Sequence, residues 1–122
     1  MSDAAKPARK SYNQIWIERE TRDINRALFS GRPVRIEYHD GDTIGAVAFL
    51  RRRAISFHEA LLDEPVHRLQ SIIVHELAHL ATAGEPEHHG PSWRRCMFRL
   101  GCHPDTGEIM AGSPLRAWLD RR

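Results

Sequence analysis

The residues with the clearest chemical potential are His75, Glu76 and His79, which form an H-E-x-x-H pattern within the apolar run 72–81. Residues four positions apart lie on the same face of a helix, so His75 and His79 can direct both imidazoles at one metal ion. Glu76 lies beside them, where its carboxylate can reach a water molecule on that metal. The pattern predicts a Zn²⁺ site at which Glu76 acts as the general base of a hydrolytic reaction.

The apolar surroundings of this pattern favour a metal site. His75, Glu76 and His79 interrupt a stretch that otherwise carries Ile, Val, Leu and Ala side chains. Burial of ionisable groups is costly unless each has a compensating partner. If both histidines were ordinary, partly buried residues, that cost would be left uncompensated. We therefore favour metal binding over a purely structural role.

A catalytic zinc site needs a third protein ligand and an open position for water. The metzincin pattern would place glycine at position 82 and histidine at position 85, but the chain has Thr82 and Glu85 there. The loop after the helix offers His89, which we favour because Gly90-Pro91 follows it and begins another helix. A ligand in that place is held by rigid elements. The alternatives are His88, Glu85 and Glu108.

Three helices are expected from apolar periodicity and from their end signals. The first covers residues 12–29 and ends before Gly31 and Pro33. The central helix covers residues 66–83 and is apolar around most of its circumference, as is typical of a buried helix. The third begins at Pro91, with Gly90 as its cap, and ends at Gly101.

Three short strands are expected between the first and central helices, over residues 34–38, 43–50 and 54–57. We expect them to form a small antiparallel meander. The apolar residues after the third helix should pack back on the core; they are Leu115, Trp118 and Leu119. The sequence thus predicts an α+β fold with an N-terminal helix, a three-stranded antiparallel sheet, the central H-E-x-x-H helix and a following helix.

The composition is that of one globular domain. At 122 residues the chain has room for one modest core, and its net charge of +2 does not demand a nucleic-acid partner. Residues 1–10 are polar and basic, and we expect a flexible tail there, followed by a single domain over 11–122.

The cysteine content and the distribution of apolar residues indicate the cellular compartment of the protein. Its two cysteines, Cys96 and Cys102, are too few for a disulfide scaffold and match no zinc-ribbon spacing. No secretory signal is visible at the N-terminus, and no run of eighteen apolar residues could cross a membrane. A cytoplasmic protein without a membrane partner is therefore expected.

The motif H-E-L-A-H-L over 75–80, followed by H-G-P-x-W over 89–93, resembles the SprT-like zinc metallopeptidases, the family that includes Spartan. The segment 55–69 also resembles the strand and linker that lead into the family's metal helix. The resemblance implies a minimal zincin fold and a peptidase that acts on protein or peptide. It also implies the roles of the site residues: His75, His79 and His89 as zinc ligands and Glu76 as catalytic base.

Two other functions are compatible with the same motif. A zincin-like hydrolase could act on a non-peptide substrate, and a non-catalytic binding module could use zinc only for stability. DNA association is a weaker expectation, based on the basic N-terminal tail and on short arginine runs such as 51–53. Three residues are candidates for stabilising an oxyanion, although packing or surface roles are favoured for each; they are Tyr38, His58 and His103.

Overall fold

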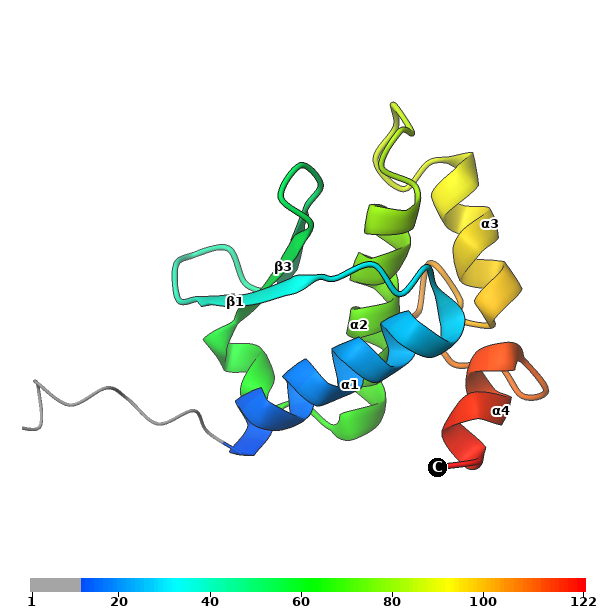
Figure 1. The fold of residues 1–122 in the computed structure, drawn as a ribbon, viewed down its shortest axis with the longest axis horizontal. Coiled ribbons are helices and arrows are strands. Elements are labelled where there is room, and N and C mark those ends of the chain that lie inside the picture. The colour runs from blue at the N-terminus through cyan, green and yellow to red at the C-terminus, as the bar shows by residue number, and fades with distance from the viewer. Residues whose placement is uncertain (1–11) are drawn as a thin grey trace, which may run out of the picture.

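The computed structural model describes residues 12–122, so the expected flexible tail over 1–10 lies outside the described residues. In chain order the elements are α1 (Tyr12–Leu28), β1 (Arg35–His39), β2 (Ala46–Phe49), β3 (Ala54–His58), the 3₁₀ helix η2 (Glu59–Asp63), α2 (Val66–Ala81), α3 (Pro91–Leu100) and α4 (Pro114–Asp120). Figure 1 shows α1 crossing α2, with α3 beside α2 and the sheet at the opposite side. The predicted α+β class is confirmed.

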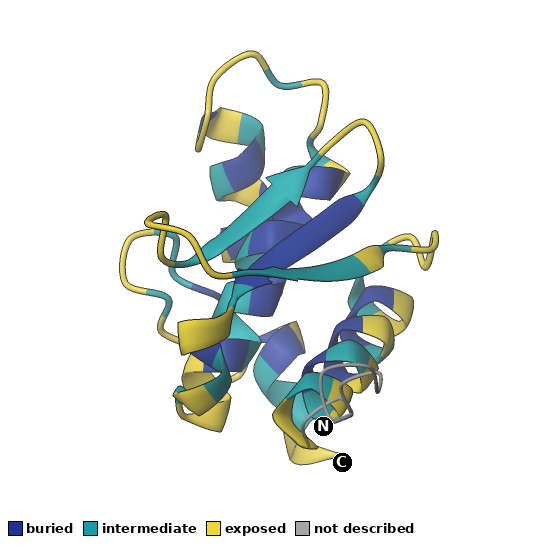
Figure 2. Ribbon diagram, turned by 90° about the vertical axis from the view of Figure 1, so that its left-hand side faces the viewer, coloured by how far each residue is buried: buried dark blue, intermediate teal, exposed yellow. Residues whose placement is uncertain are grey.

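The three-stranded sheet is mixed, so the predicted antiparallel meander is wrong. Its strand order is β1-β3-β2, with β3 parallel to β1 and antiparallel to β2. The physical reason lies in the composition of β3, in which residues 54–57 are all buried. A strand that is buried on both faces belongs in the centre of a sheet. Figure 2 shows β3 as the dark blue strand between two teal neighbours.

Helix α2 is the central support of the fold. It packs against β2, α1 and α3, and its buried residues join the same core as β3 and α3. Its apolar side chains Ile73, Val74 and Leu77 are almost completely inaccessible to solvent. The helix therefore presents the H-E-x-x-H residues from within a packed scaffold, as the apolar sequence 72–81 predicted.

Helix α1 forms as predicted, but its buried face is more polar than expected. Ile17 and Ile24 are buried together with Glu20, Thr21 and Asn25. Glu20 is 1% exposed, and its carboxylate accepts a hydrogen bond from Gln70 of α2 and forms an ion pair with Arg122 after α4. A buried charge is tolerated only when it is paired in this way.

Helix α4 was not predicted, since residues 114–120 were expected only to pack back as a tail. Ser113 caps the helix by accepting a hydrogen bond from the amide of Arg116, and Pro114 occupies its first turn. Leu115 is fully buried. The Ser-Pro pair is a recognised helix-start signal that could have identified this element. Through Leu115, α4 packs on the core beside α3.

Candidate metal centre

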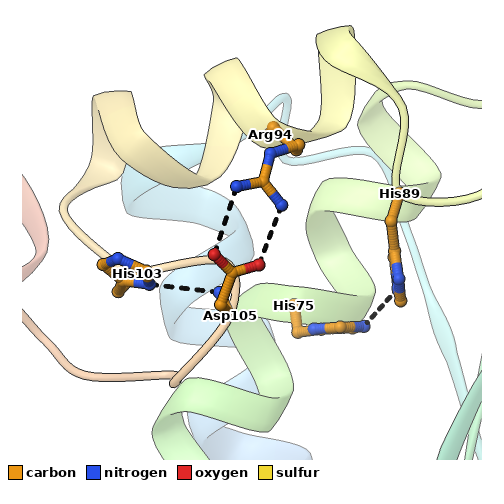
Figure 3. A network of polar contacts seen from close by, with 5 residues as sticks. All are labelled: His75, His89, Arg94, His103 and Asp105. Atoms are coloured by element: carbon orange, nitrogen blue, oxygen red, sulfur yellow. Dashed lines mark hydrogen bonds and ion pairs between the residues drawn. The ribbon is translucent and has the colours of Figure 1, made fainter.

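Three imidazoles converge on one point at the C-terminal half of α2. His75 and His79 lie one turn apart on that helix, and their ring centroids are 5.0 Å apart. His89 approaches from the loop before α3, and its Nε2 lies 3.1 Å from Nε2 of His75 (Figure 3). One potential ligand atom from each of the three residues lies within 4.8 Å of the others. Within residues 12–122 no other group of histidine, cysteine or carboxylate side chains meets this geometry.

The chemistry of these side chains suits a zinc ion. Burial, together with the neighbouring histidines, lowers the pKa of His75 to about 4 and that of His79 to about 3. Both rings are therefore neutral at pH 7, which is the form that binds zinc. Nε2 of His79 is buried and has no hydrogen-bond partner among the described residues. An unpaired buried nitrogen is costly, and a divalent ion would satisfy it.

Trp93 of α3 fixes the orientation of the imidazoles. Its side chain is 1% exposed, and its ring lies 4.8 Å from that of His75 and 4.2 Å from that of His89. The indole Nε1 donates a hydrogen bond to the backbone carbonyl of His75 at 3.2 Å. The rings are thus held by a packed aromatic side chain, which reduces the reorganisation that metal binding requires.

His88 and Glu85, two of the alternative ligands, take other positions. The His88 ring stacks on that of His79 at 4.8 Å and is not part of the ligand cluster. The Glu85 carboxylate accepts hydrogen bonds from the amides of Ser92 and Trp93, at 2.6 and 3.0 Å. Glu85 therefore caps the N-terminus of α3, where backbone amides are otherwise unpaired. Sequence reasoning considered Glu85 only as a ligand and missed this role.

The cap holds the loop in the conformation that brings His89 to the cluster. His89 has φ 56°, in the left-handed region that costs a non-glycine residue about 1–3 kcal/mol. Such a conformation persists only where its surroundings impose it. Here the Glu85 cap fixes one side of the loop and Trp93 packs against the other.

Gly90 is needed because the Glu85 side chain passes over it. A Cβ at position 90 would lie 2.8 Å from Cδ and 2.9 Å from Oε1 of Glu85. We expect Gly90→Ala to displace the cap and to lower the free energy of unfolding by about 1–2 kcal/mol, the usual effect of a lost helix cap. Urea denaturation of the metal-free protein measures this. Gly84→Ala is the control, because a methyl group at position 84 would have no neighbouring atom within 4 Å, and equal losses in both variants would contradict the expectation.

Glu76 lies beside the imidazoles in a dry environment. It is 6% exposed, and its Oε2 lies 3.7 Å from Nε2 of His75. Burial raises the pKa of Glu76 to about 8 in the metal-free protein. The neighbouring His75 does not offset this rise, because its own pKa is lowered and its ring is neutral. A carboxyl group of this kind can exchange a proton near neutral pH.

A cleft of about 580 Å³ opens onto His75 and Glu76. Its floor is the exposed side of α2, and one wall is formed by residues 44–46 at the start of β2. β2 is an edge strand of the described sheet, so one of its sides has no strand partner. The other wall is the loop 103–108, which follows the H-E-x-x-H motif at some distance in the sequence.

The loop 103–108 is tied to both neighbouring helices. Arg94 of α3 holds the Asp105 carboxylate with two hydrogen bonds, the shorter of 2.9 Å, and Nδ1 of His103 accepts from the Asp105 amide (Figure 3). On the other side, the Ser71 hydroxyl of α2 donates to the Gly107 carbonyl. The wall is therefore a fixed part of the cleft.

Of the three candidate oxyanion-stabilising residues, only His103 lines the cleft. The Tyr38 hydroxyl lies within hydrogen-bond distance of two acceptors, the Glu18 carboxylate at 3.0 Å and the Gln14 carbonyl at 3.2 Å. His58 caps η2 through Nδ1 and bonds the Gly41 carbonyl through Nε2. Tyr38 and His58 thus have packing roles. Glu108, the last alternative ligand, lines the cleft but lies outside the ligand cluster.

Comparison with known proteins identifies the class of fold as that of minimal zincin metallopeptidases. The zymogen of abylysin from Pyrococcus abyssi is 25% identical and superposes with a TM-score of 0.57, covering 66% of this chain and 74% of that one. The zymogen of jannalysin from Methanocaldococcus jannaschii is 16% identical, with a TM-score of 0.62, and covers 93% of this chain and 100% of that one. The second likeness shows the fold alone.

The chain belongs to the SprT-like family, whose model matches residues 17–111. The sequence resemblance is thereby confirmed over a wider segment than the motif itself. A comparison with curated proteins gives no match. None of the described helices is long and apolar enough to cross a membrane.

Proposed function

We propose that this chain is a zinc-dependent peptidase in which His75, His79 and His89 hold the ion and Glu76 is the general base. One observation carries the proposal: three imidazoles converge beside a buried carboxyl group, and a cleft of about 580 Å³ opens onto that group and onto His75. The metallopeptidase zymogens that share the fold support a peptide substrate. The unit that acts is residues 11–122 as a single domain.

A bound Zn²⁺ ion supplies a Lewis acid that polarises the substrate carbonyl and activates water. The protein side chains do the rest. The cleft holds an extended peptide alongside the free edge of β2, where backbone hydrogen bonds can form. Glu76 accepts a proton from the attacking water and passes it to the leaving nitrogen. Of the three residues considered for stabilising a developing oxyanion, His103 is the one that lines the cleft.

The three-residue cluster favours catalysis over a purely structural metal site. A structural zinc site normally has four protein ligands, whereas a catalytic one has three and an open position. In the described part of the chain the cluster contains three side chains, and the cleft opens onto one of them, His75.

The free state of both cysteines, Cys96 and Cys102, is consistent with a reducing compartment, and we infer a cytoplasmic location.

Metal removal tests the proposal. We expect the zinc-loaded chain to cleave an unfolded protein such as reduced, alkylated lactalbumin, to lose this activity after dialysis against a chelator, and to regain it with one equivalent of zinc. Gel electrophoresis and mass spectrometry of the products measure the cleavage. Because His75, His79 and His89 are the only described cluster of this kind, a single equivalent should suffice. Hydrolysis of a non-peptide ester without any cleavage of protein or peptide would support the non-peptide hydrolase instead.

A further inference from the structure

The cleft beside the candidate metal centre is acidic, although the chain as a whole has a net charge of +2. One guanidinium group lines it, that of Arg68. The carboxylates of Glu64, Asp105 and Glu108 line it, and Glu76 also lines it, but burial raises the pKa of that group to about 8. A concave surface of one sign concentrates ligands of the opposite sign. The cleft is therefore suited to a cationic ligand.

Two of these three carboxylates are already engaged. Glu64 forms an ion pair with Arg68 at 3.2 Å, and Asp105 forms one with Arg94 at 2.9 Å. Figure 3 shows the Arg94 side chain turned onto Asp105. Glu76 belongs to the candidate catalytic centre. Of the three carboxylates, only that of Glu108 has neither an ion pair nor a side-chain hydrogen bond within residues 12–122, so its charge is available to a ligand.

The backbone holds Glu108 in a fixed place. Its amide donates to the Thr106 hydroxyl at 3.2 Å, and its carbonyl accepts from the His103 amide at 2.8 Å. The next residue, Ile109, forms a β-bridge with Cys102. The backbone of such a closed hairpin needs little ordering when a ligand binds, so that only the Glu108 side chain has to be ordered.

Apolar side chains in the same cleft suit the stem of a long cationic residue. Ile44 lines the opposite wall and is 74% exposed, and Ile72 lies on the floor. Lysine and arginine bury their methylene groups against apolar surface while the charged end stays hydrated. The combination of apolar surface and one free carboxylate therefore favours a basic side chain over a purely apolar one.

We propose that Glu108 is a specificity-determining residue, which selects peptides that place a lysine or arginine side chain in this cleft. The inference rests on the proposed peptidase function for its biological meaning. The ammonium or guanidinium group donates hydrogen bonds to the Glu108 carboxylate. Because the carboxylate is exposed, the expected preference is modest, about two- to fivefold, and falls as salt is added.

Binding is tested first, separately from catalysis. The zinc-loaded Glu76→Gln chain is titrated with two fluorescein-labelled peptides of alternating leucine and serine, one with two lysines and the other with two glutamates. Fluorescence anisotropy should give about two- to fivefold tighter binding of the lysine peptide. Adding Glu108→Gln should remove that preference. Adding Glu59→Gln should keep it, because Glu59 is exposed on η2 and does not line the cleft.

Cleavage is tested second, with the zinc-loaded chain and a peptide library prepared from a whole proteome. Sequencing of the products should show lysine and arginine enriched near the cleaved bonds. This enrichment should disappear in Glu108→Gln and give way to aspartate and glutamate in Glu108→Lys. The zinc content of each variant, measured in parallel, shows that the metal centre is unchanged.

The two experiments separate this inference from the peptidase proposal. Equal binding of both peptides, or a lysine preference that survives Glu108→Gln, overturns the role of Glu108. A preference that depends on Glu108 without cleavage of any peptide supports the charge selection and refutes the peptidase function. Cleavage without enrichment of basic residues supports the peptidase function and refutes the charge selection by Glu108.

Discussion

Glu76→Gln is expected to lower the rate of peptide hydrolysis by about 10²- to 10⁴-fold while leaving zinc bound, because general base catalysis contributes an effect of that size. Glutamine has nearly the same shape as glutamate and can occupy the same buried position, where Glu76 is 6% exposed. It cannot accept a proton from water. The loss should therefore fall on kcat, with little change in KM.

Two measurements make this test decisive. Atomic absorption should find one zinc per chain in both wild type and Glu76→Gln, since Glu76 is not one of the three clustered residues. Thermal unfolding should show that the variant is folded. It should be at least as stable as wild type, because a carboxyl group whose pKa is raised by burial carries a desolvation cost that an amide avoids. Hydrolysis at the wild-type rate would rule Glu76 out as the base.

His79→Ala is expected to weaken zinc binding by more than about 100-fold, because loss of an outer-shell partner alone already costs about 10–100-fold. The position of His79 in the structure gives a further reason. His79 Nε2 is buried without a hydrogen-bond partner in the described chain and lies within the three-histidine cluster. Isothermal titration of the metal-free protein with zinc measures the affinity, and His75→Ala and His89→Ala should behave alike.

His88→Ala is the matched control for the third ligand. His88 precedes His89 directly, and its ring stacks on that of His79, so the substitution removes an imidazole from the same neighbourhood. We expect its zinc affinity to stay within about tenfold of wild type, the lower limit of an outer-shell effect. If His88→Ala lost zinc and His89→Ala retained it, the ligand assignment would have to be exchanged.

Local sequence was sufficient for the helical part of the candidate site. The i, i+4 spacing of His75 and His79 puts both on one face of α2 whatever surrounds it, and the apolar run on either side makes that helix buried. Gly90 and Pro91 begin α3 as predicted, since a cap followed by proline is a local signal. Such features depend on neighbours within one or two helical turns, so the sequence alone carries them.

Contacts between distant segments were decided only by the tertiary structure. The sequence predicted three strands but gave them the wrong order, that of a meander, whereas the burial of all of residues 54–57 places β3 between β1 and β2. Likewise, the sequence shows Glu85 as one carboxylate among several, and only the fold brings it to the first amides of α3. Strand order and capping from a loop are set by packing across many residues, which no local pattern encodes.

The sequence alone shows the H-E-x-x-H motif, but it does not show the third imidazole and the cleft that complete the candidate site. Residues 75–79 specify two imidazoles and a carboxylate on one helix. The third imidazole depends on the left-handed conformation of His89, and the cleft depends on a hairpin that carries Glu108 against α2. Both require long-range contacts whose entropy of closure is offset only in the packed fold. The sequence therefore specified the candidate catalytic groups, and the tertiary structure decided the shape and charge of the surface around them.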